Sequence, residues 1–226
     1  MTRALAPALL ALCCAGLAAC GGGSGGRTTE TSSFRGPEPA AWRVSVHPLG
    51  RGAFRAANVT FGPQGLALAL PAGTLDGGEV QATELRGDGT YRARLRASSA
   101  PGSLSAFFLY LHDHATDSSD ELDFEIPAGE PHRAILTVWR VGTKTPADQR
   151  TVALDFDPAA ALHDYAFVRE GGEVRFEIDG REAFRSAKAP TAALRPIFNA
   201  WYPTWLEPSV PTAAGEMLVD RYQFTG

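Results

Sequence analysis

The residues best suited to do chemistry in this chain are three acids at alternate positions, Glu121, Asp123 and Glu125, separated by Leu122 and Phe124. Alternate side chains of an extended strand point to one face, so the three carboxyls would stand in a row with apolar residues behind them. Glutamates four residues apart on a strand have Cα atoms about 13 Å apart, and side chains that lean together bring their carboxyls to about 5–6 Å. That separation suits a nucleophile and an acid/base that attack a glycosidic bond. A solvated outer strand face is the alternative explanation.

The crowding of these acids has an electrostatic consequence. Neighbouring anions raise the pKa of at least one member of a group, which would keep one glutamate protonated near neutral pH as a general acid. The shorter Asp123 would lie between Glu121 and Glu125, within hydrogen-bond reach of either. The row therefore predicts acid/base chemistry if it faces a cleft.

The segments around the acids have the period of two that is typical of half-buried strands. Apolar and charged residues alternate over 91–96 and 174–179, and the turn signals Glu170-Gly171-Gly172 and Asp179-Gly180 flank the second run. Only Pro158 to Leu162 is predicted to be helical. Further strands are expected over Gly65 to Leu70, Glu79 to Leu85, Leu104 to Leu111, Glu121 to Ile126, Arg133 to Val141, Leu194 to Trp201 and Glu216 to Phe224.

About ten short strands without alternating helices indicate an all-β fold, a two-sheet antiparallel sandwich or jelly roll. The chain has 226 residues, 44% of them hydrophobic, and a net charge of -4, which excludes a disordered protein. Its bases are dispersed among acids, so no nucleic-acid partner is expected. We expect a monomer.

The N-terminus predicts export. Arg3 precedes an apolar stretch from Ala4 to Ala19 that is too short to span a membrane. Leu17-Ala18-Ala19-Cys20 resembles the lipobox of bacterial lipoproteins, in which the cysteine is lipidated and becomes the mature N-terminus. An ordinary signal peptide is the alternative. We therefore expect a signal peptide over 1–19, the lipidated Cys20 and a flexible linker over 20–34, and a catalytic domain over 35–226.

The acid row also carries a resemblance to a known family. Glu121-Leu122-Asp123-Phe124-Glu125 resembles the catalytic strand of glycoside hydrolase family 16, in the branch of lichenases and xyloglucan-active enzymes. Further stretches that match the family in the expected order are 89–96, 102–110, 163–167, 177–180, 199–201 and 217–220. The resemblance implies a concanavalin A-like β-jelly roll with a glycan cleft across its concave sheet.

The resemblance also implies roles for single residues. Glu121 would be the nucleophile, Glu125 the acid/base, and Asp123 the residue that orients and tunes Glu121, with retention of configuration and no catalytic cofactor. For each cleft aromatic the alternative to sugar contact is packing in the core. At Phe108 the two alternatives are evenly balanced. The residues that fall at sugar-binding positions are Tyr110, Phe108, Trp139, Asn199, Trp201 and Glu79. A structural calcium at Asp220 is a further expectation from the family.

One departure from the family leaves the substrate open. Lichenases have a tryptophan two residues before the catalytic glutamate, where this chain has Ser119. The sequence predicts an endo-acting β-glucan hydrolase, anchored by lipid at the outer membrane or cell surface of a bacterium. Two alternatives stay open, an inactive carbohydrate-binding lipoprotein on the same fold and a structural envelope lipoprotein without a glycan ligand.

Overall fold

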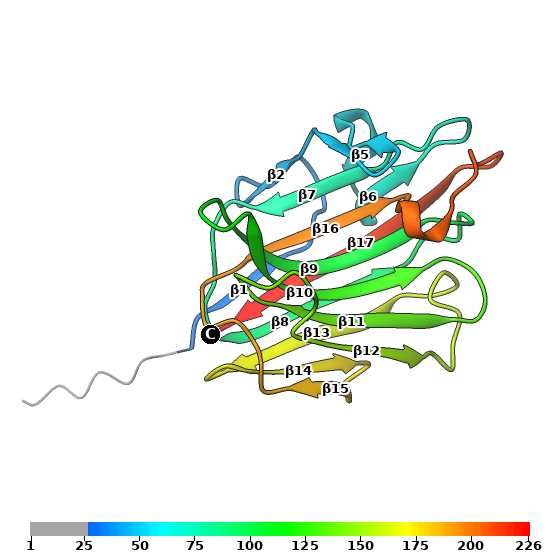
Figure 1. Cartoon of the computed structure of the whole chain (residues 1–226). Coiled ribbons are helices and arrows are strands. Elements are labelled where there is room, and N and C mark those ends of the chain that lie inside the picture. Colours follow the sequence, from blue (N-terminus) through cyan, green and yellow to red (C-terminus); the bar gives the residue numbers. More distant parts are fainter. Residues whose placement is uncertain (1–26) are drawn as a thin grey trace, which may run out of the picture.

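The computed structural model describes residues 27–226, which form two antiparallel sheets packed face to face (Figure 1). We name the front sheet of Figure 1 the cleft sheet and the other the back sheet. The cleft sheet runs in the order β12 (Asp148–Ala153), β11 (Arg133–Trp139), β10 (Ser118–Pro127), β9 (Leu104–Asp113), β16 (Arg195–Trp201), β7 (Gly78–Ala82) and β2 (Trp42–Val44). The expected all-β jelly roll is confirmed.

The back sheet runs in the order β15 (Arg181–Ser186), β14 (Glu173–Ile178), β13 (His163–Glu170), β8 (Gly89–Arg96), β17 (Gly215–Thr225), β6 (Gly65–Leu70) and β5 (Val59–Gly62), with β1 (Thr29–Ser32) paired to β17. A small hairpin is formed by β3 (Pro48–Leu49) and β4 (Gly52–Ala53). The helical elements of the described residues are two short 3₁₀ turns, η1 (Ala56–Asn58) and η2 (Thr204–Leu206). Neither is long enough to cross a membrane.

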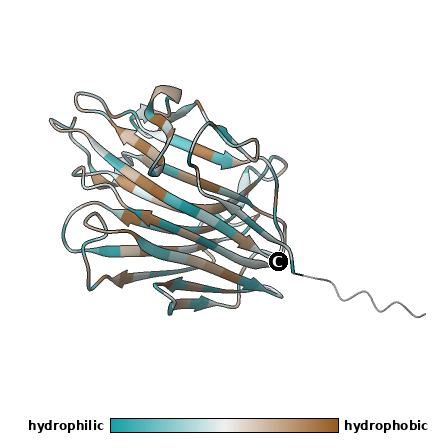
Figure 2. Cartoon of the chain, turned by 180° about the vertical axis from the view of Figure 1, so that it is seen from behind, coloured by the Kyte–Doolittle hydropathy of each residue, from teal (hydrophilic) through white to brown (hydrophobic). Residues whose placement is uncertain are grey.

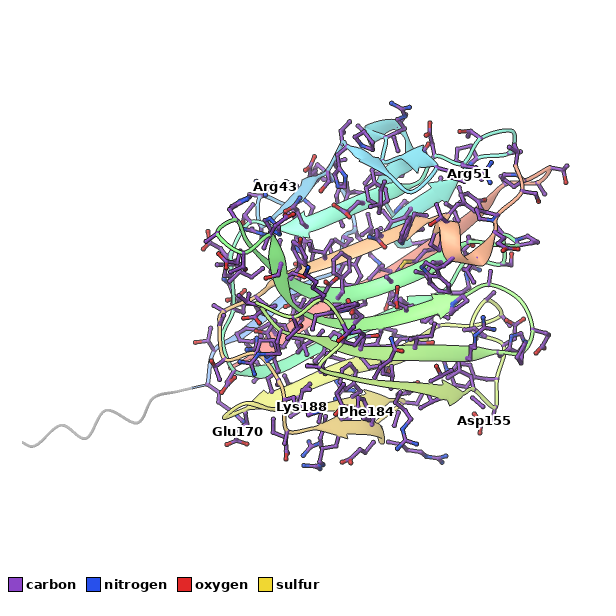
Figure 3. All side chains as sticks on the ribbon, viewed as in Figure 1. Arg43, Arg51, Asp155, Glu170, Phe184 and Lys188 are labelled. Carbon is purple, nitrogen blue, oxygen red and sulfur yellow. The ribbon has the colours of Figure 1, made fainter. Side chains whose placement is uncertain are left out.

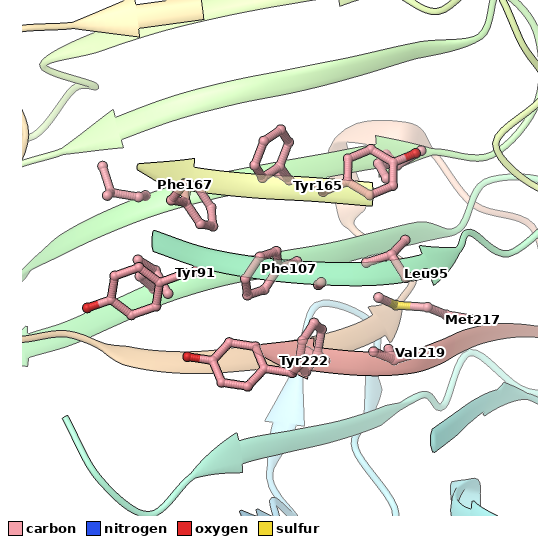
Figure 4. Close-up of a cluster of buried hydrophobic side chains, with 14 of the residues drawn as sticks. Tyr91, Leu95, Phe107, Tyr165, Phe167, Met217, Val219 and Tyr222 are labelled. Carbon is pink, nitrogen blue, oxygen red and sulfur yellow. The ribbon is translucent and has the colours of Figure 1, made fainter. Parts of the chain in front are cut away.

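The core lies between the sheets and is rich in aromatic rings. Phe107 of β9 packs on Phe198 of β16, with ring centroids 4.8 Å apart. It also packs on Phe167 of β13 at 5.0 Å (Figure 4). Phe124 of β10 meets Phe167 at 4.8 Å and Phe176 of β14 at 5.3 Å. Polar and apolar residues alternate along the strands of the back sheet (Figure 2). Each strand thus contributes one apolar face to the core, as its period of two predicts.

Most strand predictions are confirmed, and the helix prediction is wrong. Pro158–Leu162 forms turns, in which Ala159 donates its backbone N–H to the Asp157 carboxylate over 2.9 Å. A five-residue segment is too short to pay the nucleation cost of a helix, whatever its alanine content. The sequence also gave no sign of the edge strand β12, whose residues are mostly polar and exposed.

The folded domain begins earlier than expected. Residues 20–34 are predicted to be a flexible linker, yet Thr29–Ser32 pair with Tyr222–Thr225 of β17 as strand β1. Ser32 also accepts a hydrogen bond from the Trp42 indole over 2.9 Å. The expected signal peptide over 1–19 and the expected lipidated Cys20 lie outside the described residues.

Candidate active site

The acid row lies at the centre of the cleft sheet. On β10, Leu122, Phe124 and Ile126 are buried in the core with at most 1% of their surface exposed, so Glu121 and Glu125 point to the opposite face with Asp123 between them. Both glutamates are partly accessible, whereas Asp123 is only 5% exposed. The predicted alternation of the strand is confirmed, and the carboxyls line a cavity rather than a flat solvated surface.

Strand register places aromatic residues beside Glu121 and Asp123. Tyr110 of β9 and Trp139 of β11 are the direct neighbours of Glu121 on either side. Phe108 of β9 is the neighbour of Asp123. Directly paired residues of adjacent strands share a face, so these aromatic rings and the carboxyls point into the same cleft.

The cleft extends to both sides of the acid row. On the β9 side it forms a pocket of about 360 Å³, and on the β11 side one of about 500 Å³. Residues of the first pocket include the acids with Glu79, Phe108, Tyr110, Asn199 and Trp201. Residues of the second include the acids with Thr137, Trp139, Gln149 and Trp205. The structure therefore brings every predicted catalytic and sugar-binding residue into one groove.

A polar cluster lies in the β9-side pocket. Glu79 is 5% exposed and Asn199 4%, and Asn199 Nδ2 donates to Glu79 Oε2 over 3.2 Å. His47 Nε2 lies 3.3 Å from Glu79 Oε1. Its Nδ1 lies 3.0 Å from the backbone oxygen of Pro48. A carboxylate and an amide that are held in this way can bind sugar hydroxyls in a fixed orientation.

The three carboxyls do not ionise as free acids would. Burial and the neighbouring Glu121 charge raise the pKa of Glu125 to about 7. Burial, then the charges of Glu121 and Glu125, raise the pKa of Asp123 well above its usual range. Burial raises the pKa of Glu121 as well, while hydrogen bonds from Asp123 and Ser119 oppose that rise. Near neutral pH the row thus holds protons that its members would lose in water.

The residue that replaces the lichenase tryptophan contacts the predicted nucleophile. Ser119 Oγ donates a hydrogen bond to Glu121 Oε2 over 3.2 Å. His112 of β9 is the strand neighbour of Ser119, and its Nδ1 lies 3.4 Å from the Tyr110 hydroxyl. This part of the cleft therefore carries a serine and an imidazole where the lichenase pattern has an indole.

Several cleft residues escaped the sequence analysis. His47 and Leu49 come from the segment around β3, Gln81 from β7, Gln149 and Thr151 from β12, and Trp205 from η2. Trp205 is half-exposed at 50%. It follows β16 in a turn-rich segment, where no periodic pattern marks it as a cleft residue. The others lie on short or polar elements without a diagnostic pattern.

The residues around Asp220 do not fit the expected calcium site. Arg35 Nη2 forms an ion pair with the Asp220 carboxylate, and Arg35 Nε donates to the backbone oxygen of Pro63 over 3.1 Å. The Arg35 guanidinium thus already occupies the oxygen atoms of Asp220 and Pro63 that would have to coordinate a cation. Among residues 27–226, no group of three or more His, Cys, Asp or Glu side chains has a geometry that could hold a metal ion.

Comparisons with known proteins agree with this geometry. The chain is 29% identical over 161 residues to an endo-1,3-1,4-beta-glycanase of Rhizobium meliloti, covering 66% of this chain and 57% of that protein. It is 28% identical over 159 residues to a Bacillus subtilis beta-glucanase, covering 68% and 65%. It therefore spans about three fifths of these relatives.

Solved structures show the same fold. A Bacillus licheniformis beta-glucanase superposes with a TM-score of 0.78 at 21% identity, covering 88% of this chain and 98% of that one. Residues 51–216 match the sequence profile of Glycosyl hydrolases family 16. This match spans most of the folded sandwich and includes the acid row. The chain belongs to glycosyl hydrolases family 16.

Proposed function

We propose that this protein is a retaining endo-acting glycoside hydrolase that cleaves a β-linked glucan or a related polysaccharide by double displacement. The observation that carries the proposal is the acid row of β10, which faces a groove flanked by Tyr110 and Trp139. The homologous glycanase and glucanase support the substrate class. Pockets on both sides of the acids support internal cleavage, because a polymer can pass through without presenting an end.

The proposed first step uses the two glutamates in different protonation states. Glu125, with its pKa raised to about 7, donates its proton to the glycosidic oxygen as the bond to the leaving sugar breaks. Glu121 attacks the anomeric carbon and forms a covalent glycosyl-enzyme. Protonated Asp123 hydrogen-bonds to Glu121 and holds it as the anion that attacks, which fits the high pKa of Asp123.

The second step reverses the role of the acid/base. Glu125, now deprotonated, takes a proton from water, and the resulting oxygen attacks the anomeric carbon and releases Glu121. Two inversions leave the configuration of the sugar unchanged. The aromatic rings beside the acids would stack on pyranose faces, and the Glu79–Asn199 pair would bind hydroxyls.

A screen with an inactive variant tests this proposal. The purified chain from residue 27 would be incubated with lichenan, laminarin, xyloglucan, agarose and carrageenan, and reducing ends would be measured. We expect release from at least one β-glucan, and at least a ~10³-fold loss in Glu121→Gln with an unchanged circular dichroism spectrum. Glu216→Gln, on β17 of the back sheet, is the matched control and should keep full activity.

Two outcomes would contradict the proposal. Turnover by Glu121→Gln at the wild-type rate would remove Glu121 from the mechanism. Binding of a polysaccharide by the wild-type protein without any release of reducing ends would instead support the inactive carbohydrate-binding alternative.

We also propose that the protein is a lipoprotein of the bacterial envelope, exported by residues 1–19 and anchored through Cys20. Support comes from the lipobox-like Leu17-Ala18-Ala19-Cys20, and Gly21 after the cysteine favours the outer membrane over the inner membrane. The test is membrane fractionation of cells that express the full chain. Wild type should sediment with membranes and Cys20→Ser should not, whereas equal partition of the two would refute lipid anchoring.

A further inference from the structure

Two arginines stand on the cleft face beside the β9-side pocket. Arg195 of β16 is the strand neighbour of Tyr110, which is itself the neighbour of Glu121. Arg43 of β2 is the neighbour of Gln81, and its Nη2 donates to Gln81 Oε1 over 2.8 Å. Figure 3 shows Arg43 at the outer edge of the sheet, beyond β7. Neither arginine lines the pocket itself, but each is the strand neighbour of a residue that does, Gln81 for Arg43 and Tyr110 for Arg195.

Neither arginine forms an ion pair with an acid. Within the described part of the chain, no carboxylate lies within ion-pairing distance of Arg43 or Arg195. By contrast, Arg92, Arg94 and Arg96 of the back sheet pair with Glu177, Asp164 and Glu216. Arg43 and Arg195 thus form a local positive patch beside a groove whose centre carries the carboxyls of Glu79, Glu121, Asp123 and Glu125.

Arg195 is fixed in place by uncharged groups. Its Nη1 donates to the backbone oxygens of Ala82 and Thr83 over 2.5 and 2.7 Å. Burial, followed by the positive charge of Arg43, lowers the pKa of Arg195, while the negative charge of Glu84 opposes this shift. The spacing of the strands places the Cα atoms of Arg43 and Arg195 about 12 Å apart, and long arginine side chains span that gap. Two like charges in this arrangement repel each other, and an anion bound between them would relieve the repulsion.

A neutral glucan offers these guanidinium groups only hydroxyl oxygens as hydrogen-bond acceptors, and no charge to pair with. Arg195 lies two strands from β10, about 10 Å from the acid row. That distance leaves room for the reacting sugar, and it places the guanidinium groups next to a neighbouring sugar residue of the polysaccharide. Guanidinium forks match planar carboxylates and tetrahedral sulfates, which carry the charge of acidic polysaccharides. The acids of the row repel such a substrate, so cations nearby would be needed to bind it.

We propose that Arg43 and Arg195 form an anion-binding subsite, and that the substrate is a β-linked polysaccharide bearing carboxylate or sulfate groups. This inference rests on the proposed glycosidase function and names its substrate class. The subsite acts on sugar residues away from the bond that breaks, so it contributes to binding rather than to the chemical step.

The test compares one backbone with and without charge. Wild type, Arg43→Gln and Arg195→Lys would be assayed on lichenan and on lightly carboxymethylated and sulfated lichenan. We expect kcat/KM at least about tenfold higher on one charged form. Arg43→Gln should lose that advantage through KM, so that its kcat/KM falls more on the charged form than on lichenan. Arg195→Lys keeps the charge but loses the fork, so it should retain part of the preference. Arg181→Gln on β15 removes a charge far from the cleft and should behave as wild type.

Affinity electrophoresis of Glu121→Gln in gels that contain each polysaccharide separates this proposal from the proposed function. Stronger retardation by a charged form, abolished by adding Arg43→Gln, would support the subsite even if no polysaccharide is cleaved. Equal retardation by neutral and charged forms, or equal kcat/KM values, would overturn it. Failure of the wild-type chain to release reducing ends would overturn only the hydrolase assignment.

Discussion

At the scale of single residues, the behaviour of the site depends on burial of charge. Glu125 lies on a strand whose other face is the core, and Glu121 adds a negative charge next to it. Glu125 therefore keeps its proton at a pH at which a free glutamate is already ionised. In the proposed mechanism, this makes Glu125 the proton donor and Glu121 the nucleophile on a single strand.

The pH dependence of activity follows from that pKa. The general acid must be protonated, so we expect kcat/KM to fall as the pH rises through about 7. Ionisation of Glu121 sets the acid limb of the profile, at a pH above the usual range of a glutamate. Initial rates between pH 4 and pH 9 on the best substrate would check this. A profile that is flat up to pH 9 would contradict the role of Glu125.

The same shift has a cost in stability. Between the unfolded pKa of Glu125, 4.5, and its folded value of about 7, the folded state binds more protons than the unfolded state, so the free energy of unfolding falls as the pH rises. Glu125→Gln removes this loss and should be more stable than wild type by about 3 kcal/mol at pH 8. Urea unfolding at pH 4 and pH 8 measures it, and the gain should vanish at pH 4.

At the scale of elements, the site is built by register rather than by sequence proximity. Four adjacent strands, β11, β10, β9 and β16, carry the residues of one cross-strand row, Trp139, Glu121, Tyr110 and Arg195. A slip of one residue in β9 would turn Tyr110 into the core and Leu111 into the groove. The aromatic core behind these strands thus determines which side chains reach the substrate.

Strand β1 gives a prediction at this scale. A chain that starts at residue 33 lacks the pairing of Thr29–Ser32 with β17 and the Glu30–Arg86 ion pair, and it leaves the Trp42 indole without its acceptor. We expect its Tm to lie several degrees below that of a chain that starts at residue 27. Thermal unfolding of the two chains measures the difference. Identical Tm values would mean that β1 adds nothing to the fold.

Sequence patterns predicted the parts of the site that are strongly periodic. The alternation at Glu121 to Ile126 located the acid row, because one face of that strand had to be apolar. Trp139 and Asn199 were expected only through the family resemblance, since no local pattern shows which strands are neighbours. His47 and Trp205 lie in turn-rich segments, and β1 and β12 are polar edge strands. The positions of these residues and strands depend on tertiary packing, which the periodicity of the sequence does not encode.

At the scale of the whole molecule, stability comes from the packed sandwich and its ion pairs. The Arg35–Asp220 pair and the Arg35–Pro63 hydrogen bond tie the segment before β2 to the β5–β6 turn and to β17. Because the guanidinium already contacts these oxygens, we expect that no divalent cation is needed there. The fold should therefore be independent of metal.

Chelation tests this prediction. Excess EDTA, with or without subsequent addition of calcium, should leave the Tm of the domain unchanged. Arg35→Gln exposes the Asp220 carboxylate, and its Tm should fall slightly, since a partly exposed ion pair contributes about 0.2–1 kcal/mol. A drop of several degrees in the wild-type Tm on EDTA treatment would show that a bound cation supports the fold.

The groove that continues past the acid row on both sides has a consequence for how a polymer solution changes during the reaction. Each cut near the middle of a long chain halves its length, and the thickness of the solution depends far more on chain length than on the number of chain ends. We therefore expect viscosity to collapse after very few cuts, with fragments of intermediate length accumulating before any short oligosaccharide. We therefore expect viscometry to detect activity at protein concentrations that give no signal in a reducing-sugar assay.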